Sequence, residues 1–191
     1  MSFKDYFSLQ SKEYSLYRPK YPPSLFEYLS SLVNEHEVAW DCATGNGQAA
    51  IGLLPFFKSV IATDASPTQL EHAIINPVIT YKTALAEESG LESHSVDLLT
   101  VATAIHWLDT DRFYPEVRRI LKPGGVIALW LYDHCRINEE LDVLSREYSE
   151  KTVVEYWPIE NRKAWNFEES VDFPFERIKT PEFLLKVNWS L

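Results

Sequence analysis

Short apolar runs alternate with helix-type patterns along the first two thirds of the chain. Five runs are rich in apolar and β-branched side chains and have the length of strands: residues 38–40, 59–63, 79–83, 96–102 and 126–131. Between them, apolar residues recur at the three- and four-residue spacing that predicts helices. Strands that alternate with helices predict an α/β fold with a doubly wound, mostly parallel sheet.

The expected helices are bounded by recognisable start and stop residues. Pro22–Pro23 and Ser66–Pro67 suit the first turn of a helix, and Asp109 or Thr110 can cap another. The resulting helices cover about residues 23–33, 48–57, 66–74 and 110–121. Beyond the fifth strand, residues 133–155 are charged and helical in pattern, and the apolar run 183–189 predicts a sixth strand.

A turn of small residues follows the first strand directly. It contains Gly45 and Gly47, with Asp41 before them and Thr44 and Gln48 around them. A ligand can lie against bare backbone only where no Cβ intervenes, which is the reason for glycine here. Strand, glycine turn and helix are typical of a nucleotide-type site, and Asp41 is placed to orient the turn. The full dinucleotide pattern Gly-x-Gly-x-x-Gly is not met, because the third glycine comes two residues late.

An acidic residue at the end of the second strand limits the classes of ligand that fit this site. Asp64 lies 17 residues beyond Gly47. A carboxylate in this position can accept hydrogen bonds from both ribose hydroxyls of an adenosine. The ligand is therefore expected to be a dinucleotide or S-adenosylmethionine.

Four segments together resemble a known family. Residues 41–47 (DCATGNG), 64–70 (DASPTQL), 102–108 (ATAIHWL) and 121–125 (LKPGG) look like successive motifs of the class I S-adenosylmethionine-dependent methyltransferases. The small-molecule branch that includes the trans-aconitate methyltransferases, of the methyltransferase type 11 kind, is the most similar. The resemblance runs from about Tyr14 to about Trp130. This sequence departs from the family at Ala43, where a glycine is usual, and at Leu85, where many members carry an acid.

The resemblance implies a Rossmann-like methyltransferase fold and S-adenosyl-L-methionine as the cofactor. It implies an N-terminal lid over residues 1–21, in which an arginine can bind the cofactor's carboxylate bidentately. It also implies cofactor contacts along the carboxyl ends of the strands. The expected cofactor-binding residues are Tyr14, Arg18, Asp41, Ala43, Thr44, Gly45, Gly47, Gln48, Asp64, Ala65, Ser66, Gln69, Ala86, Glu87, Ala102 and Ala104.

His106 and Trp107 are the expected residues on the catalytic, acceptor side. They follow the fourth strand, where ligands of doubly wound sheets bind. A lone histidine is more often structural, but this position favours a function. A hydroxyl or amine acceptor would benefit from a base such as His106, whereas a carboxylate acceptor is already ionised at neutral pH and needs none. The expected acceptor is a small molecule, such as a carboxylate that becomes O-methylated.

Composition fits one cytoplasmic enzyme domain. The 191 residues suffice for a single domain over 1–191, with a substrate cap over 133–165. The net charge of −10 disfavours nucleic acid as a partner, because that binding depends on Lys and Arg. Two cysteines without a Cys-x-x-Cys pair or His cluster predict no metal site. No apolar run is long enough to span a membrane, and the N-terminus lacks a secretory pattern.

The end of the chain predicts an incomplete sheet. The resembled methyltransferases have seven strands, whereas only two residues follow the sixth apolar run here. An unpaired apolar strand edge promotes association. We therefore expect missing C-terminal strands, in either a fragment of a longer protein or a chain that completes its sheet as a homodimer.

Two other functions stay open on sequence grounds. A nicotinamide-dependent oxidoreductase would also use the glycine turn and Asp64, although the third glycine and an obvious hydride-transfer site are missing. A cofactor-binding module without catalysis would retain the same motifs.

Overall fold

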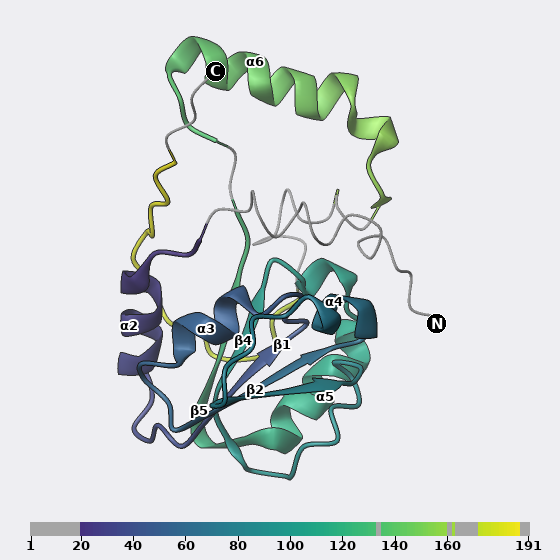
Figure 1. Cartoon of the computed structure of the whole chain (residues 1–191). Coiled ribbons are helices and arrows are strands. Elements are labelled where there is room, and N and C mark those ends of the chain that lie inside the picture. Colours follow the sequence, from purple (N-terminus) through teal and green to yellow (C-terminus); the bar gives the residue numbers. More distant parts are fainter. Residues whose placement is uncertain (1–19, 133–134, 160–161, 163–171, 188–191) are drawn as a thin grey trace.

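Five parallel strands form the centre of the molecule. The structure, a computed structural model, describes residues 20–132, 135–159, 162 and 172–187. The sheet has the order β3-β2-β1-β4-β5, and every neighbouring pair is parallel (Figure 1). This confirms the doubly wound α/β fold. The strands are β1 (Val38–Cys42), β2 (Ser59–Asp64), β3 (Ile79–Thr83), β4 (Val96–Ala102) and β5 (Leu121–Trp130).

Helices cover both faces of this sheet (Figure 1). Side chains of β1 alternate between the two faces, as the period of a strand requires. Ala39 packs into the core beneath α2 and α3, whereas Trp40 packs into the core beneath α5. All of β1 beyond its first residue is buried. The helical elements of this part are α2 (Pro23–Ser31), α3 (Gln48–Leu53), α4 (Pro67–Glu71), the 3-10 turn η2 (Ile105–Trp107) and α5 (Thr110–Ile120).

Two helices end at least three residues earlier than the sequence pattern predicts. α3 ends at Leu53 instead of Phe57, because Pro55 has no N–H to donate to the carbonyl of Ile51. α4 ends at Glu71 instead of continuing to Ile74. The N–H of Ile74 donates to the carbonyl of Asn46 at 3.1 Å, which ties this segment to the glycine turn.

β5 begins five residues earlier than predicted. Leu121 already pairs with Val96 of β4, and the register then shifts before Leu98 pairs with Val126. Gly124, with φ +81°, lies within this irregular stretch. The Lys-Pro-Gly-Gly sequence that indicates a helix end thus also forms an irregular entry into the last strand.

The segment after β5 is helical where it is described. It contains α6 (Glu139–Glu147), the π-helical turn η3 (Tyr148–Thr152) and the 3-10 turn η4 (Val154–Tyr156). The side chain of Asn138 accepts from the N–H of Leu141 at 2.9 Å and so caps α6. α6 lies apart from the sheet, over its upper end in Figure 1. Of the described helices, none has the length and apolar character needed to cross a membrane.

The predicted sixth strand is wrong in the described part of the chain. Residues 172–187 contain no helix or strand, and no backbone–backbone hydrogen bond joins them to β5. Side chains hold this segment instead: the ring of Phe183 lies 5.6 Å from that of Tyr28, and Arg118 donates to the carbonyl of Pro174 at 2.7 Å. Apolar content made residues 183–187 look like a strand, but it did not provide a pairing partner. Assembly with a second copy stays a prediction.

Candidate cofactor and acceptor site

The turn after β1 has three residues in the left-handed region: Ala43 (φ +53°), Gly45 (φ +57°) and Gly47 (φ +89°). The two glycines serve different purposes. A Cβ at Gly45 would make only an ordinary van der Waals contact among the described residues, with Gln69 Oε1 at 3.8 Å. A Cβ at Gly47 would collide with the hydroxyl of Tyr81. Close approach of a ligand is therefore possible at Gly45, whereas the absence of a side chain at Gly47 makes room for a residue of β3.

Asp41 organises this turn from below. Its carboxylate is fully buried and accepts from the hydroxyl of Thr44, from the N–H of Ala50 at 3.0 Å and from the hydroxyl of Thr100 at 2.8 Å. Burial raises the pKa of Asp41 to about 6, and the charge of Asp64 adds to the shift, although the three hydrogen bonds oppose it. The turn, the start of α3 and the middle of β4 are thus joined through one side chain.

Asp64 connects the turns after β1 and β2. One carboxylate oxygen accepts from the N–H of Gly45 at 2.8 Å, and the other accepts from the N–H of Ser66 at 2.9 Å. Each carboxylate oxygen can accept more than one hydrogen bond. The ribose contact stays a prediction.

Three carboxylates converge on this end of the sheet. Burial, and then the charges of Asp41, Glu87 and Asp64, raise the pKa of the Cys42 thiol well above its usual value. This thiol is consequently unreactive. The same negative charges favour a cationic ligand over an anionic one at this point of the site.

The turn after β3 is fixed by its own side chains. Glu87 accepts from the N–H of Asp109 at 2.9 Å, which directs its carboxylate toward the start of α5. Ser89 donates to Glu116 through both its N–H, at 3.0 Å, and its hydroxyl. Hydrogen bonds from Arg119 and Ser89 keep the pKa of Glu116 below its usual range. Ala86 is buried in this turn.

The end of β4 carries a strained residue. Thr103 has φ +57°, which is unusual for a β-branched side chain. Its N–H donates to the carbonyl of Trp130 at 2.8 Å, and its hydroxyl lies 3.0 Å from the hydroxyl of Tyr21. His106 and Trp107 follow in η2, with their ring centroids 4.9 Å apart.

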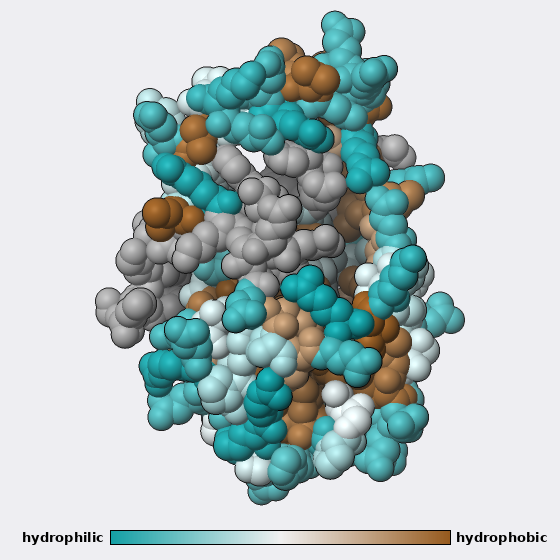
Figure 2. Space-filling view, turned by 180° about the vertical axis from the view of Figure 1, so that it is seen from behind, coloured by the Kyte–Doolittle hydropathy of each residue, from teal (hydrophilic) through white to brown (hydrophobic). Residues whose placement is uncertain are grey.

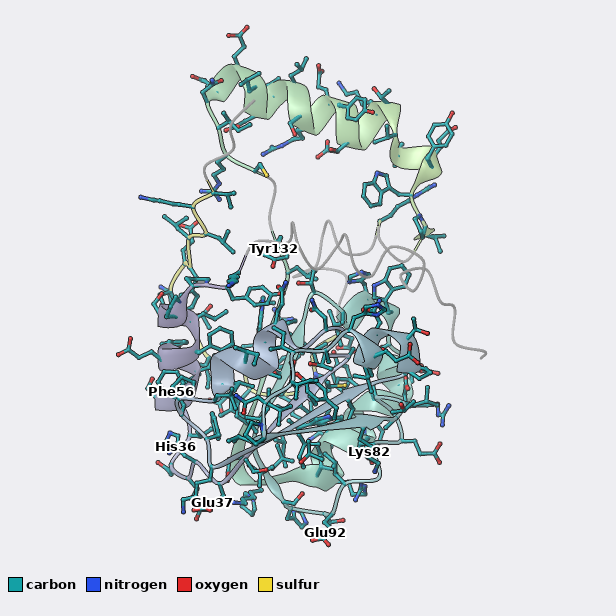
Figure 3. All side chains as sticks on the ribbon, viewed as in Figure 1. His36, Glu37, Phe56, Lys82, Glu92 and Tyr132 are labelled. Carbon is teal, nitrogen blue, oxygen red and sulfur yellow. The ribbon has the colours of Figure 1, made fainter. Side chains whose placement is uncertain are left out.

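Aromatic rings gather beside this strand end. The ring of Tyr21 meets that of Trp130 edge-on at 5.4 Å and stacks on Tyr132 at 5.4 Å with an interplanar angle of 13°. Figure 3 places Tyr132 at the upper end of the sheet, opposite to His36 and Glu37. The rings therefore lie at the carboxyl ends of the strands, next to the predicted acceptor side.

Known proteins that are similar to this chain point to one family. The family model described as a methyltransferase domain matches residues 40–129. A solved structure, named "putative type II methyltransferase" from Anaeromyxobacter dehalogenans, is 36% identical with a TM-score of 0.79 over 86% of this chain and 70% of that one. The chain belongs to the methyltransferase-domain family.

Curated methyltransferases are also similar to this chain, and they are longer than it. A "putative methyltransferase" from Dictyostelium discoideum is 35% identical over 84% of this chain and 62% of its own length. A "probable S-adenosylmethionine-dependent methyltransferase" from Saccharomyces cerevisiae is 31% identical over 65% of this chain and 46% of its own length. The chain thus spans less than two thirds of these relatives.

The methyltransferase cofactor fits the residues present. No described atom lies closer than 3.8 Å to a Cβ added at Gly45, and the buried side-chain oxygen of Gln48 has no hydrogen-bond partner. An unpaired buried acceptor at the start of α3, which follows the glycine turn, suits an ammonium group. Tyr14 and Arg18 lie outside the described residues. Within the described ranges, no group of three His, Cys, Asp or Glu side chains could hold a metal ion.

The structure brings most of the predicted methyltransferase site to one edge of the sheet. Ala43, Thr44 and Gly45 lie in the turn between Asp41 of β1 and Gln48 of α3, and the N–H of Gly45 donates to Asp64. The sequence reasoning assigned no role in the site to several residues: Thr100, which holds Asp41, and Tyr21, Thr103 and Trp130, which meet at the end of β4. The positive φ of Thr103 has no sequence signal. The alternation of β5 does put Trp130 on the same face as Ala128.

Proposed function

We propose that this protein is an S-adenosylmethionine-dependent methyltransferase that acts on a small-molecule acceptor. The observation that carries the proposal is the turn at Gly45, whose N–H donates to the carboxylate of Asp64, together with the unpaired buried oxygen of Gln48 at the start of α3. This arrangement offers bare backbone to a nucleoside and negative charge to a cationic sulfur and amine. Membership of the methyltransferase-domain family supports the same reading.

Each part of the site has a proposed role. Asp64 accepts from the ribose hydroxyls, and Gln48 accepts from the amino group of the methionine end. Ala65, Ser66 and Gln69 flank the ribose. The turn with Ala86 and the exposed Leu85 holds the adenine by packing, because the Glu87 carboxylate is already engaged at the start of α5. Ala102 and Ala104 border the methyl group.

The proposed acceptor is a carboxylate, as in the trans-aconitate methyltransferase branch. When bound, the cofactor supplies a methyl group on a positively charged sulfur, and the carboxylate oxygen forms a new C–O bond as the C–S bond breaks. No proton has to move, because the acceptor is already ionised at neutral pH. The protein then mainly has to align the acceptor and exclude water. His106 and Trp107 line the acceptor side in this proposal and supply no obligatory base.

Binding and turnover measurements test this function separately. Isothermal titration calorimetry with S-adenosylhomocysteine and with NADH distinguishes a methyltransferase from an oxidoreductase, and only the first ligand is expected to bind. Incubation with methyl-labelled cofactor and a panel of small carboxylates, phenols and amines then tests catalysis. Preferential NADH binding would reject the proposal, and binding of S-adenosylhomocysteine without turnover of any acceptor would favour the non-catalytic module.

A further inference from the structure

A buried N–H at the end of β5 has no acceptor. The indole Nε1 of Trp130 is enclosed, and it finds no hydrogen-bond partner. A buried donor left unpaired costs about 1–3 kcal/mol, so native proteins rarely keep one without a reason. The other indole that is buried in the sheet behaves differently, because Trp40 Nε1 donates to the hydroxyl of Thr63 at 2.9 Å. The unpaired N–H of Trp130 therefore suits a hydrogen bond to an oxygen atom of a ligand.

The surroundings of Trp130 are aromatic. Tyr21 lies edge-on to it at 5.4 Å and Phe26 at 6.5 Å, and Tyr132 stacks on Tyr21. We call these four side chains, Tyr21, Phe26, Trp130 and Tyr132, the aromatic wall. Tyr132 is 39% exposed, so the wall is accessible to solvent on its side. Flat or apolar groups bind well against such rings.

The aromatic wall adjoins the proposed methyl-transfer point. Thr103 contacts two of its members, through the carbonyl of Trp130 and the hydroxyl of Tyr21. Thr103 is followed directly by Ala104 and η2, which contains His106. Backbone strain of the kind seen at Thr103 is concentrated at functional sites in proteins. A molecule bound at the wall would therefore lie beside the acceptor side of the cofactor pocket.

An apolar groove continues from Trp130 along β5. Its volume is about 520 Å³, which is in the range of small-molecule sites. Figure 2 shows hydrophobic surface gathered on the lower part of the molecule, on the side where α2 and β5 lie. Arg177 is the one cation among the described residues that line the groove, together with the acid Glu176. Such a lining suits an apolar body and provides little for a compound with several negative charges. The other residues of the lining are Leu25, Tyr28, Leu29, Leu32, Leu121, Gly125, Val126, Ile127, Ala128, Leu129, Trp130, Phe173, Phe175, Ile178, Thr180 and Phe183.

We infer that the indole ring of Trp130, which lines the groove, turns so that its enclosed Nε1 donates a hydrogen bond to a carboxylate oxygen of the methyl acceptor, and that the aromatic wall binds the apolar body of that acceptor. The acceptor class is then an apolar monocarboxylate, in contrast to the tricarboxylate of the trans-aconitate branch. This inference rests on the proposed methyltransferase function and names its substrate class. Trp130 is an acceptor-binding residue in this assignment.

The test uses cinnamate as an apolar monocarboxylate and trans-aconitate as a tricarboxylate. Calorimetry measures the affinity of each for the whole chain saturated with S-adenosylhomocysteine. Trp130→Phe keeps an aromatic ring and removes the N–H, and it is expected to weaken cinnamate binding about tenfold or more, as for a hydrogen bond to a charged group. Trp40→Phe is the matched control, because its N–H has a partner within the protein; it should lower the melting temperature and leave cinnamate affinity unchanged.

A second variant covers the case in which Trp130→Phe fails to fold. Tyr132→Ala removes an exposed ring of the aromatic wall, and it should weaken cinnamate binding while S-adenosylhomocysteine affinity stays the same. If Trp130→Phe folds, a cinnamate affinity equal to that of the wild type would overturn the inference. If Trp130→Phe does not fold, an unchanged cinnamate affinity in Tyr132→Ala would overturn it. Tighter binding of trans-aconitate than of cinnamate to the wild type would also overturn it. A wild-type chain that binds no S-adenosylhomocysteine rejects the methyltransferase function itself, and the inference falls with it.

Discussion

The hydroxyl of Tyr81 occupies the space that a side chain on Gly47 would need. This hydroxyl donates to the carbonyl of Ile74 at 2.9 Å, and burial together with the charge of Asp41 raises the pKa of Tyr81 to about 12, so it remains protonated. The second glycine of the turn is therefore required by the packing of β3 against the turn. The first glycine, Gly45, has no such neighbour.

This difference predicts a stability effect at Gly47. Gly47→Ala should lower the free energy of unfolding by about 1–3 kcal/mol more than Gly124→Ala does, because overpacking costs this much in a tight site. Gly124 is the matched control, since it has φ +81° and no neighbour within 4 Å of an added Cβ. Urea unfolding followed by circular dichroism measures both variants. Equal destabilisation by the two substitutions would show that Tyr81 moves aside freely.

A different outcome is expected at Gly45. Gly45→Val should abolish binding of S-adenosylhomocysteine in calorimetry, because the added side chain would fill the space that we assign to the ligand. The fold should survive, since the nearest atom to an added Cβ is 3.8 Å away and the left-handed backbone costs about 1–2 kcal/mol. Gly124→Val, at another left-handed glycine with open surroundings, is the control for that backbone cost. Retained binding in a folded Gly45→Val protein would move the ligand away from this turn.

The carboxylate of Asp64 should be needed for cofactor affinity. Asp64→Asn is expected to weaken S-adenosylhomocysteine binding by about 1.5–3 kcal/mol, the amount for a hydrogen bond to a charged group. The asparagine keeps one oxygen for the N–H of Gly45 or of Ser66, so the turns are disturbed less than by alanine. Asp111→Asn, on the exposed side of α5, should have no effect. An unchanged affinity in the Asp64 variant would contradict the ribose assignment.

Asp41 should make the free energy of unfolding depend on pH in an unusual direction for a carboxyl group. Its pKa is about 6 in the folded protein, above the ordinary aspartate pKa of 3.8 in the unfolded chain, so the folded state binds more protons between these values. A raised carboxyl pKa makes stability fall as pH rises through this window, by roughly 3 kcal/mol in total for this residue. The contribution is fully present below pH 3.8 and is lost above pH 6.

Comparison with Asp41→Asn isolates this effect from the other carboxyl groups. The free energy of unfolding, measured by urea titration from pH 4 to pH 7, should decline more steeply in the wild type than in the variant. Parallel curves for the two proteins would show that Asp41 ionises normally in the fold. The variant retains an oxygen that can accept from Thr100 or Ala50.

The sequence predicted β2, β3 and β4 well from their β-branched, aromatic and apolar residues. β3 and β4 have the predicted bounds, and β2 adds only Asp64. The helix ends were less accurate, although Pro55 is a stop that the sequence does contain. The run 183–187 was misread because apolar residues do not specify which strand, if any, will accept their backbone hydrogen bonds.

In the candidate site, too, local features could be predicted from the sequence and long-range contacts could not. The turn residues could be proposed from the sequence because their spacing is local, from Asp41 to Gln48. The contact between Tyr21 and Thr103 joins residues 82 positions apart, and no local pattern indicates it. The unpaired N–H of Trp130 is also a property of packing, since it depends on what surrounds the ring in three dimensions.

The last prediction concerns Ala43, where this chain departs from the glycine that is usual in the resembled methyltransferases. Ala43 has φ +53°, a conformation that costs an L-residue about 1–2 kcal/mol and that glycine adopts freely. Ala43→Gly should therefore raise the free energy of unfolding by up to about 1 kcal/mol, after the larger entropy loss of glycine on folding is subtracted. Ala50→Gly, in the middle of α3, provides the opposite control, because glycine in a helix interior destabilises. Thermal unfolding with and without S-adenosylhomocysteine measures stability and ligand binding together. A lower melting temperature for Ala43→Gly would mean that the alanine methyl contributes more by packing against the α5-side core than its backbone strain costs.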